Sequence, residues 1–265
     1  MGTYVISDIH GCYKEFLTML DKIRFSDTDQ LVLAGDYIDK GKQSYEMLQW
    51  IVNCLSNVVL IRGNHDEEFA GCIGLMLQID KKEKLASCFS SNKDAIALYQ
   101  SVKYVLKDKD SLGLYFDMYG TIKDLLYNYG VTLEMLCKWA ETFLKMPYYY
   151  ELQVKARHCI IVHAGYARKL EDTSTSFSSL EEFYLYARAE SIQQGGIHHG
   201  IVIAGHTPTI AKGKFAYNKG NVFKYYDKEK DCIFYDIDCG CTFRNKNGDA
   251  KLACIRLEDE KIFYV

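Results

Sequence analysis

The first part of the chain alternates short β-rich runs with helical apolar periodicity, and this alternation limits the folds that are open to it. Strand-like runs occupy Tyr4–Ile6, Gln30–Leu33 and Val58–Ile61. An apolar stripe with helical spacing over 16–23 separates the first two runs, and a helix is predicted over Tyr45–Leu55 between the second and third. This βαβαβ order predicts an α/β fold that begins with a parallel sheet.

The middle of the chain is mainly helical in pattern from Glu67 to about Lys145. Thr132 is a predicted N-cap for a helix that ends near Pro147. A helical elaboration is predicted at about 79–117, between the polar motif that contains His65 and the polar motif that begins at His163. Because it is inserted between those motifs, we expect it to influence substrate choice.

Strand-like runs return at Cys159–Val162 and Ile201–Ala204, with a helix between them opened by the capping box of Ser179 and Glu182. Four further strand-like runs close the chain, at 222–226, 232–237, 252–257 and 262–265. Polar turns separate these four runs, which predicts a second, largely antiparallel sheet.

Composition excludes several classes of protein. The 265 residues are 48% hydrophobic, and 32 basic against 35 acidic residues leave a formal charge of −3. This is typical of one globular domain over 1–265, without the basic excess that nucleic acids or anionic membranes attract. No apolar run approaches the roughly 20 residues of a membrane span. Without a secretory signal at the start, we expect a cytoplasmic protein with most of its ten cysteines reduced.

Five polar clusters stand directly after predicted strands. They are Ser7–Gly11, Gly35–Gly41, Arg62–Asp66, His163–Gly165 and Gly205–Pro208. Ligands of open α/β sheets gather at the carboxyl ends of strands, so clusters far apart in sequence can meet there. We therefore expect them to form one site.

The clusters offer carboxylate, imidazole and amide ligands, a set that suits Mn, Fe or Zn. The candidate ligands are Asp8, His10, Asp36, Asn64, His163 and His206. Two metals fit this number of ligands better than one, and a carboxylate such as Asp36 can bridge them. A water between two cations would supply hydroxide near neutral pH. The other histidines, His158, His198 and His199, lack this context and are interpreted as structural or surface residues.

With these motifs the sequence resembles the phosphoprotein phosphatase branch of the calcineurin-like metallophosphoesterases, and in particular its bacterial members. The family signature reads GDxHG, GDxxDRG, GNH(E/D), HAG and GHTP, and this chain has a counterpart of each in the same order. His10–Tyr13, Phe143–Tyr148 and Asp238–Cys241 match further bacterial motifs. The resemblance implies a four-layer α/β/β/α sandwich with metals between the facing loops.

The resemblance also implies a role for each matching residue. One metal would be held by Asp8, His10 and Asp36, and the second by Asp36, Asn64, His163 and His206. His65 would be the general acid that protonates the leaving oxygen, with Asp39 as its partner. Arg62 and Arg188 match the arginines that bind the phosphoryl group.

The sequence departs from the family pattern at three places. Lys40 stands where an arginine is expected, so its ammonium replaces a bidentate guanidinium in phosphate binding. Ser7 replaces the first glycine of the signature, and Asp66 replaces a glutamate that is common in eukaryotic members. Of the three, Lys40 is the change expected to alter phosphate affinity.

The leading functional hypothesis is a metal-dependent phosphomonoesterase, a serine/threonine protein phosphatase that uses a metal-bridging hydroxide. Phosphorylated proteins or small phosphate esters would be its substrates, and two divalent ions, Mn first among them with Fe, Zn or Co as alternatives, its cofactors. The main alternative is a symmetrical dinucleoside polyphosphate hydrolase that splits diadenosine tetraphosphate. An RNA-end phosphatase is disfavoured by the acidic balance. A non-enzymatic metal-binding scaffold would be expected to have lost ligands, and here all are present.

Overall fold

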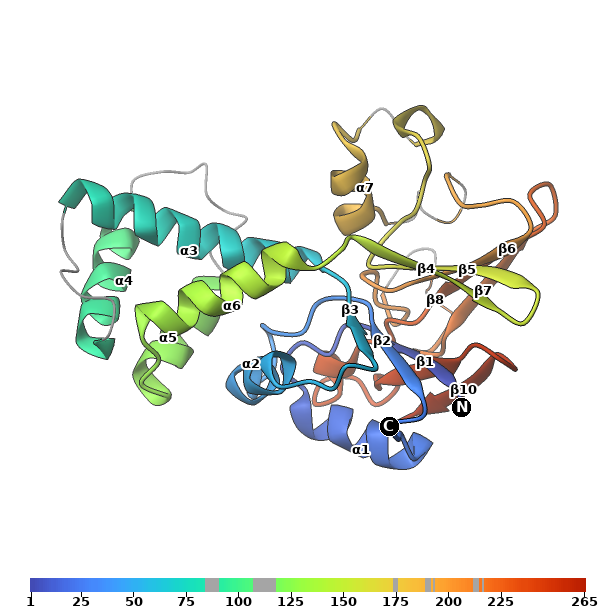
Figure 1. Ribbon diagram of the computed structural model, residues 1–265, viewed down its shortest axis with the longest axis horizontal. Coiled ribbons are helices and arrows are strands. Elements are labelled where there is room, and N and C mark those ends of the chain that lie inside the picture. Colours follow the sequence, from blue (N-terminus) through green and yellow to red (C-terminus); the bar gives the residue numbers. More distant parts are fainter. Residues whose placement is uncertain are drawn as a thin grey trace.

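The parallel start of the chain forms one side of the first sheet in the computed structural model, from the central strand to one edge (Figure 1). The structure describes residues 1–83, 91–106, 118–173, 176–188, 192, 194–211, 215 and 217–265. Strands β1 (Thr3–Ile6), β2 (Gln30–Leu33) and β3 (Val58–Leu60) pair in parallel. Helices α1 (Tyr13–Ile23) and α2 (Ser44–Val52) connect them. This confirms the predicted βαβαβ order.

The prediction that the last four strands form a separate antiparallel sheet is wrong. Strands β9 (Ala253–Arg256) and β10 (Lys261–Tyr264) extend the first sheet, in the order β10-β9-β1-β2-β3. Strands β7 (Phe223–Asp227) and β8 (Cys232–Asp236) join the second sheet instead. The alternating patterns identified strands but held no information about which sheet each one would join.

The second sheet has the order β4-β5-β6-β8-β7 and is mixed. Its other strands are β4 (Tyr149–Val154), β5 (Arg157–Val162) and β6 (Gly200–Ala204). β6 lies parallel to β5 and β8, while β4 and β7 pair antiparallel at the edges. The parallel centre directs the carboxyl ends of β5 and β6 to one end of this sheet, which matters for the site.

The two sheets face each other across an apolar core, as the period of two in their strands requires. On β1 and β2, Val5 and Val32 face this core, where they join Ile161 and Ile203 of the second sheet. Ile6 and its neighbours on the alternate face pack instead against α1 and α2. Helix α7 (Leu180–Tyr186) covers the outer face of the second sheet. These layers, two mixed sheets flanked by helices, are those of the predicted α/β/β/α sandwich.

Four helices between the sheets' strands lie to one side of the sandwich (Figure 1). They are α3 (Asn64–Glu83), α4 (Asn92–Leu106), α5 (Met118–Asn128) and α6 (Leu133–Lys145), joined by one apolar cluster with the outer face of the first sheet. This agrees with the helical pattern predicted from Glu67 to about Lys145. Of the elaboration predicted at about 79–117, the segments 84–90 and 107–117 lie outside the described residues.

Both predicted helix starts are capped by side chains. Thr132 Oγ1 accepts a hydrogen bond from Met135 N, and Ser179 Oγ accepts one from Glu182 N. The Glu182 carboxylate bonds back to Ser178 N rather than to the N-cap amide. Short 3₁₀ helices lie at Leu170–Asp172 and Cys241–Phe243. Within the described ranges, every helix falls short of the length and apolarity that a bilayer crossing needs.

Candidate active site

The strand-end loops of both sheets converge on the carboxylate of Asp36, which follows β2. Asp36 Oδ2 lies 3.3 Å from Nε2 of His10, in the loop after β1. Asp36 Oδ1 lies 3.5 Å from Nε2 of His163, which follows β5 of the second sheet. His163 Nε2 in turn lies 3.2 Å from Nδ1 of His206, after β6. The predicted meeting of the clusters is therefore what the structure shows.

Several of these loop residues have left-handed backbone. Asp8, His10, Asp36 and His206 have φ values of 51°, 46°, 56° and 69°. Residues other than glycine adopt this region rarely, and such strain collects at functional sites. The positive φ values turn each loop sharply just beyond its strand, so that the side chains face one another.

Two glycines make this close approach possible. A Cβ on Gly63 would lie 2.3 Å from both the backbone nitrogen and Oδ1 of Asp36. A Cβ on Gly205 would lie 2.1 Å from Asp8 Oδ2. Any side chain at either position would displace a site carboxylate.

Backbone carbonyls orient two of the imidazoles. The Nδ1 atoms of His10 and His163 lie 3.0 Å from Ile38 O and 2.9 Å from Ala34 O. Since a carbonyl only accepts, each Nδ1 carries the proton and donates it. The unprotonated Nε2 atoms are left facing Asp36, as in metal-ligating histidines.

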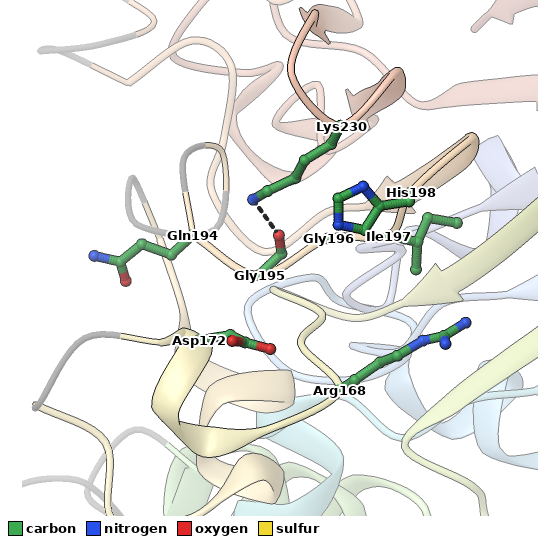
Figure 2. Close-up of a pocket in the computed structure, with 8 residues that line it drawn as sticks. All are labelled: Arg168, Asp172, Gln194, Gly195, Gly196, Ile197, His198 and Lys230. Carbon is green, nitrogen blue, oxygen red and sulfur yellow. Dashed lines mark hydrogen bonds between the residues drawn. The ribbon is translucent and has the colours of Figure 1, made fainter.

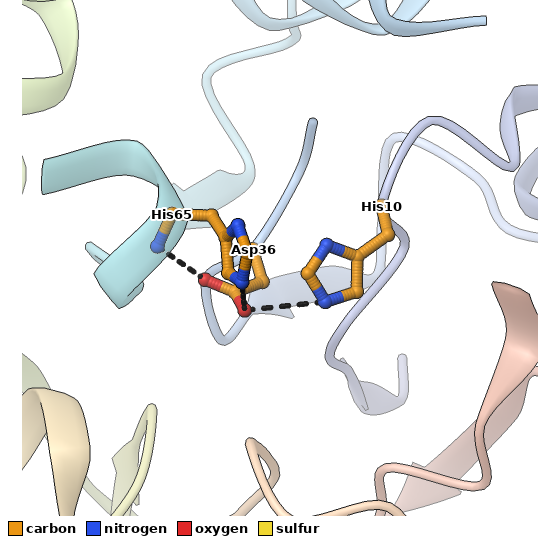
Figure 3. Close-up of side chains that lie close together, drawn as sticks. All are labelled: His10, Asp36 and His65. Atoms are coloured by element: carbon orange, nitrogen blue, oxygen red, sulfur yellow. Dashed lines mark hydrogen bonds and ion pairs between the residues drawn. The ribbon is translucent and has the colours of Figure 1, made fainter. Parts of the chain in front are cut away.

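Asp36 belongs to two side-chain groups that could each hold a metal ion. His10, Asp36 and His65 form one group, and Asp36, His163 and His206 form the other, with ligand atoms within 4.8 Å of one another. Figure 3 shows the first group, with both imidazoles directed at the carboxylate. The ligand set predicted from the sequence contains Asp8, and not His65, beside His10 and Asp36. Asp8 Oδ1 lies 3.9 Å from His10 Nε2. Asn64 Oδ1 is 3.0 Å from His163 Nε2.

Two buried atoms of the cluster indicate that an outside ligand completes it. Asp8 Oδ1 and His206 Nε2 have no hydrogen-bond partner within the described part of the chain. The burial of a polar atom without a hydrogen-bond partner costs free energy, so two such atoms in a native site need an explanation. Divalent metals accept these mixed nitrogen and oxygen donors. The residues present therefore fit a metal centre.

Electrostatics favour the ligating form of Asp36, His10 and His206. Burial alone would raise the pKa of the Asp36 carboxyl, but neighbouring imidazoles, led by His163, outweigh it and hold that pKa well below its usual range. Burial lowers the pKa of His10 to about 3 and that of His206 well below its ordinary value. Ionised carboxylate and neutral imidazole are the forms that bind metal.

His65 and Asp39 form a close ion pair at the edge of this cluster. His65 Nδ1 lies 2.9 Å from Asp39 Oδ2, and Thr121 Oγ1 of α5 donates to Asp39 Oδ1 at 2.7 Å. Burial by itself lowers the pKa of His65, but the charge of Asp36 and the bond to Asp39 raise it to about 9. The pair is arranged to hold a proton on His65.

The three predicted phosphate-binding residues differ in their surroundings. Lys40 Nζ lies 3.1 Å from His10 Nε2, and Arg188 Nη1 lies 3.5 Å from His206 O, so both reach the cluster. The buried guanidinium of Arg62 instead contacts Glu67, Tyr148 and backbone carbonyls at the end of α6. Arg62 therefore connects the end of α6 to the loop before α3. Its role in phosphate binding stays a prediction.

Sequence reasoning gave no positioning role to two residues that fix the site. Asp66 accepts backbone hydrogen bonds from Asp36, Tyr37 and Gly63 at 2.8–3.2 Å and so fixes the loop that bears Asp36. Its place as the last residue of the GNH(E/D) motif was a signal for this. Thr121 holds Asp39 from 82 residues away, and no local pattern marks it.

A separate hollow of about 380 Å³ lies on the second sheet's side of the molecule (Figure 2). It is lined by Arg168, Asp172, Gln194–His198 and Lys230. Lys230 Nζ donates to Gly195 O at 2.6 Å across it. Since its lining includes none of the predicted site residues, it is distinct from the Asp36 cluster.

Two facing sheets with a buried carboxylate–imidazole cluster at their strand ends define a metal-dependent phosphoester hydrolase. The sequence profile of the calcineurin-like phosphoesterases matches residues 1–209, and the chain belongs to that family. Members of the family normally bind divalent metals and are hydrolases, so this protein is an enzyme.

Among curated proteins, the symmetrical bis(5'-nucleosyl)-tetraphosphatase of Buchnera aphidicola subsp. Acyrthosiphon pisum (strain Tuc7) is 37% identical over 99 residues. The match spans 37% of this chain and 36% of that protein, about a third of the relative's length.

Solved structures of two differently named enzymes share the fold. One, provisionally assigned as a diadenosine tetraphosphatase, covers all of this chain with 93% of its own, at a TM-score of 0.54 and 14% identity. A protein serine/threonine phosphatase of Saccharomyces cerevisiae covers all of this chain with 79% of its own, at 0.53 and 12%. At these identities the likeness concerns the fold alone.

Proposed function

We propose that this enzyme hydrolyses dinucleoside polyphosphates symmetrically, with diadenosine tetraphosphate as the model substrate and two divalent metals, Mn first among them, as cofactors. The observation that carries the hydrolytic part is the Asp36 carboxylate shared by two imidazole groups. The substrate class is supported by the curated relative's name, which favours our alternative hypothesis over the serine/threonine phosphatase. The whole chain would act as one domain, because both sheets share one core.

The metals would be held by the set that the family resemblance implies. Asp8, His10 and Asp36 would bind one ion, and Asp36, Asn64, His163 and His206 the other. Bound there, divalent ions lower the pKa of water and neutralise phosphoryl charge. The chain's part is to keep these ligands fixed, by the carbonyl bonds to His10 and His163 and by the loop contacts of Asp66.

His65 would supply the proton that the departing oxygen needs. Its Nδ1 faces the Asp39 carboxylate, so Nε2 faces the reaction, 3.9 Å from Asp36 Oδ2. Water adds to phosphorus, the P–O bond to the leaving nucleotide breaks, and that oxygen takes the proton from His65 Nε2. The proton that the water releases on adding to phosphorus restores the charged imidazole for the next turnover. Asp39 orients the imidazole and stabilises its charged form before transfer.

Lys40 and Arg188 would bind the phosphoryl oxygens from the rim of the cluster. Both cations are exposed, yet each has a contact to a site histidine. An ammonium binds phosphate as a point charge, whereas a guanidinium can bind two oxygens at once. The chain therefore combines one cation of each kind, with Arg62 as the third candidate.

The test compares three substrates with one Mn-loaded preparation: diadenosine tetraphosphate, a phosphoserine peptide and an aryl phosphate. We expect ADP as the nucleotide product and the highest kcat/KM for the dinucleotide. Asp36→Asn, prepared in parallel, controls for contaminating hydrolases. A phosphopeptide kcat/KM above that of the dinucleotide would return the serine/threonine phosphatase to first place.

A further inference from the structure

A cavity of about 500 Å³ opens beside the His65–Asp39 pair, between the loop after β2 and helix α5. The loop contributes Asp39, Lys40, Gly41 and Lys42, and the first residue of α2 contributes Ser44. Helix α5 and its end contribute Gly120, Thr121, Asp124, Asn128 and Tyr129. Its volume lies within the range of small-molecule sites. Because Asp39 and Lys40 belong to both the cavity and the cluster, one ligand can occupy the two together.

The position of the cavity identifies which part of a substrate would enter it. In an in-line displacement the leaving group departs on the side of the general acid. Here that side is the His65–Asp39 pair, and Asp39 is also a wall of the cavity. The departing half of a substrate is therefore directed toward α5.

The charges of the cavity suit a polyphosphate. Lys40 and Lys42 bring two ammonium groups to the cavity lining, and Lys40 Nζ also reaches His10 of the cluster. Of the two carboxylates that line it, Asp39 is engaged by His65 and Thr121, and Asp124 accepts a hydrogen bond from Asn128. A chain of phosphates extending from the cluster thus meets Lys40, and Lys42 and the polar groups of α5 line the same cavity.

The far end of the cavity presents a supported aromatic ring. Tyr129 stacks on Tyr45 with ring centroids 4.5 Å apart and planes 17° from parallel. Tyr45 is held in turn by an edge contact from Trp139, at 6.2 Å. Tyr129 remains 36% exposed, so a planar base can extend this stack.

We propose that this cavity binds the departing nucleotide of a dinucleoside polyphosphate, with its phosphates at Lys40 and Lys42 and its base stacked on Tyr129. The inference rests on the proposed function and adds a site for the leaving group. It explains how an enzyme with this cluster can prefer a nucleotide leaving group to the side chain of a phosphoprotein.

The experiment measures KM and kcat of Tyr129→Ala and Lys42→Ala for diadenosine tetraphosphate and for an aryl phosphate. Loss of base stacking should raise the dinucleotide KM by about tenfold, and loss of the lysine by about fivefold. The ratio of the dinucleotide KM to the aryl KM should rise nearly as much. Tyr129→Phe, which keeps the ring, should restore the KM.

Two matched controls lie outside the cavity. Tyr127→Ala removes an exposed tyrosine from the last turn of α5, two residues before Tyr129, and Lys138→Ala removes an exposed lysine from α6. Neither should change the KM ratio. If Tyr129→Ala does not fold, Gly120→Leu fills the same cavity from a helical position where a Cβ meets nothing within 4 Å, and it should raise the ratio too.

The outcomes separate the two levels of the proposal. An unaltered protein that hydrolyses the aryl phosphate but not the dinucleotide overturns the proposed function, and the cavity assignment with it. An unaltered protein that releases ADP normally, with an unchanged KM ratio in Tyr129→Ala, Lys42→Ala and Gly120→Leu, overturns the cavity assignment alone.

Discussion

Two charged clusters each connect the first sheet to the second, and they differ in whether the chain satisfies them. Glu260, between β9 and β10, contacts Arg157 and Tyr235 and lies 2.8 Å from Lys224, all on the second sheet. Asp36 likewise meets His163 of the second sheet, but in its cluster buried atoms of Asp8 and His206 remain unpartnered in the described structure. The Glu260 cluster is complete as a structural connection, whereas the Asp36 cluster needs a ligand.

The replacement of Asp36 should reveal the largest functional difference between the Asp36 cluster and the Glu260 cluster. Asp36→Asn keeps the shape of the side chain but removes the charge that both imidazole groups share. Metals contribute several kcal/mol to phosphoryl transfer, so we expect kcat to fall by at least roughly 10³-fold. Metal content and turnover would be measured together at limiting Mn. Near-native turnover there would contradict the shared role of Asp36.

His65→Asn should have the next largest effect. Loss of a general acid lowers kcat by roughly 10² to 10⁴-fold, and here metal binding should persist. An aryl phosphate needs less protonation of its leaving oxygen than an alkyl phosphate does, so it should lose less. Equal losses on both esters would assign His65 a structural role.

Gly63→Ala tests whether the cluster depends on close backbone approach. Its Cβ would meet Asp36, so we expect destabilisation of about 1–3 kcal/mol together with loss of activity. Gly74→Ala is the matched control, because a Cβ there, on α3, meets nothing within 4 Å. Thermal unfolding and aryl phosphate turnover would be compared, and equal behaviour of the two variants would refute the steric argument.

Glu260→Gln should have the smallest effect, and on stability rather than on catalysis. Burial raises the pKa of Glu260, but Lys224, Tyr235 and Arg157 outweigh it and lower that pKa to about 2, below the ordinary 4.5. The cluster therefore stabilises the fold above pH 4.5 and loses this contribution as the pH falls through about 2.

We expect Glu260→Gln to lower the free energy of unfolding by about 1 kcal/mol at neutral pH. The difference from the unaltered protein should vanish toward pH 2, and turnover should stay the same. Denaturant unfolding at several pH values measures this. A loss of activity as large as that of His65→Asn would show that the two clusters are not independent.

The site could be predicted where its signals are local. Asp8, Asp36, His163 and His206 each follow a buried apolar strand within a few residues, and parallel strands place such positions at one end of a sheet. The predicted starts of α6 and α7 were confirmed for the same reason, since a capping side chain bonds to an amide three residues away. Strand β4 was not predicted, because its edge position leaves it without a buried apolar run.

The sequence by itself determined which side chains stand at the strand ends, since backbone preference and apolar period act over a few residues. Only the tertiary structure decided how the last strands divide between the sheets, that Arg62 turns toward the end of α6, and that Thr121 reaches Asp39. Those contacts join residues 82 or more positions apart. These contacts depend on how whole layers of secondary structure pack, and that packing produces no periodic pattern in the sequence.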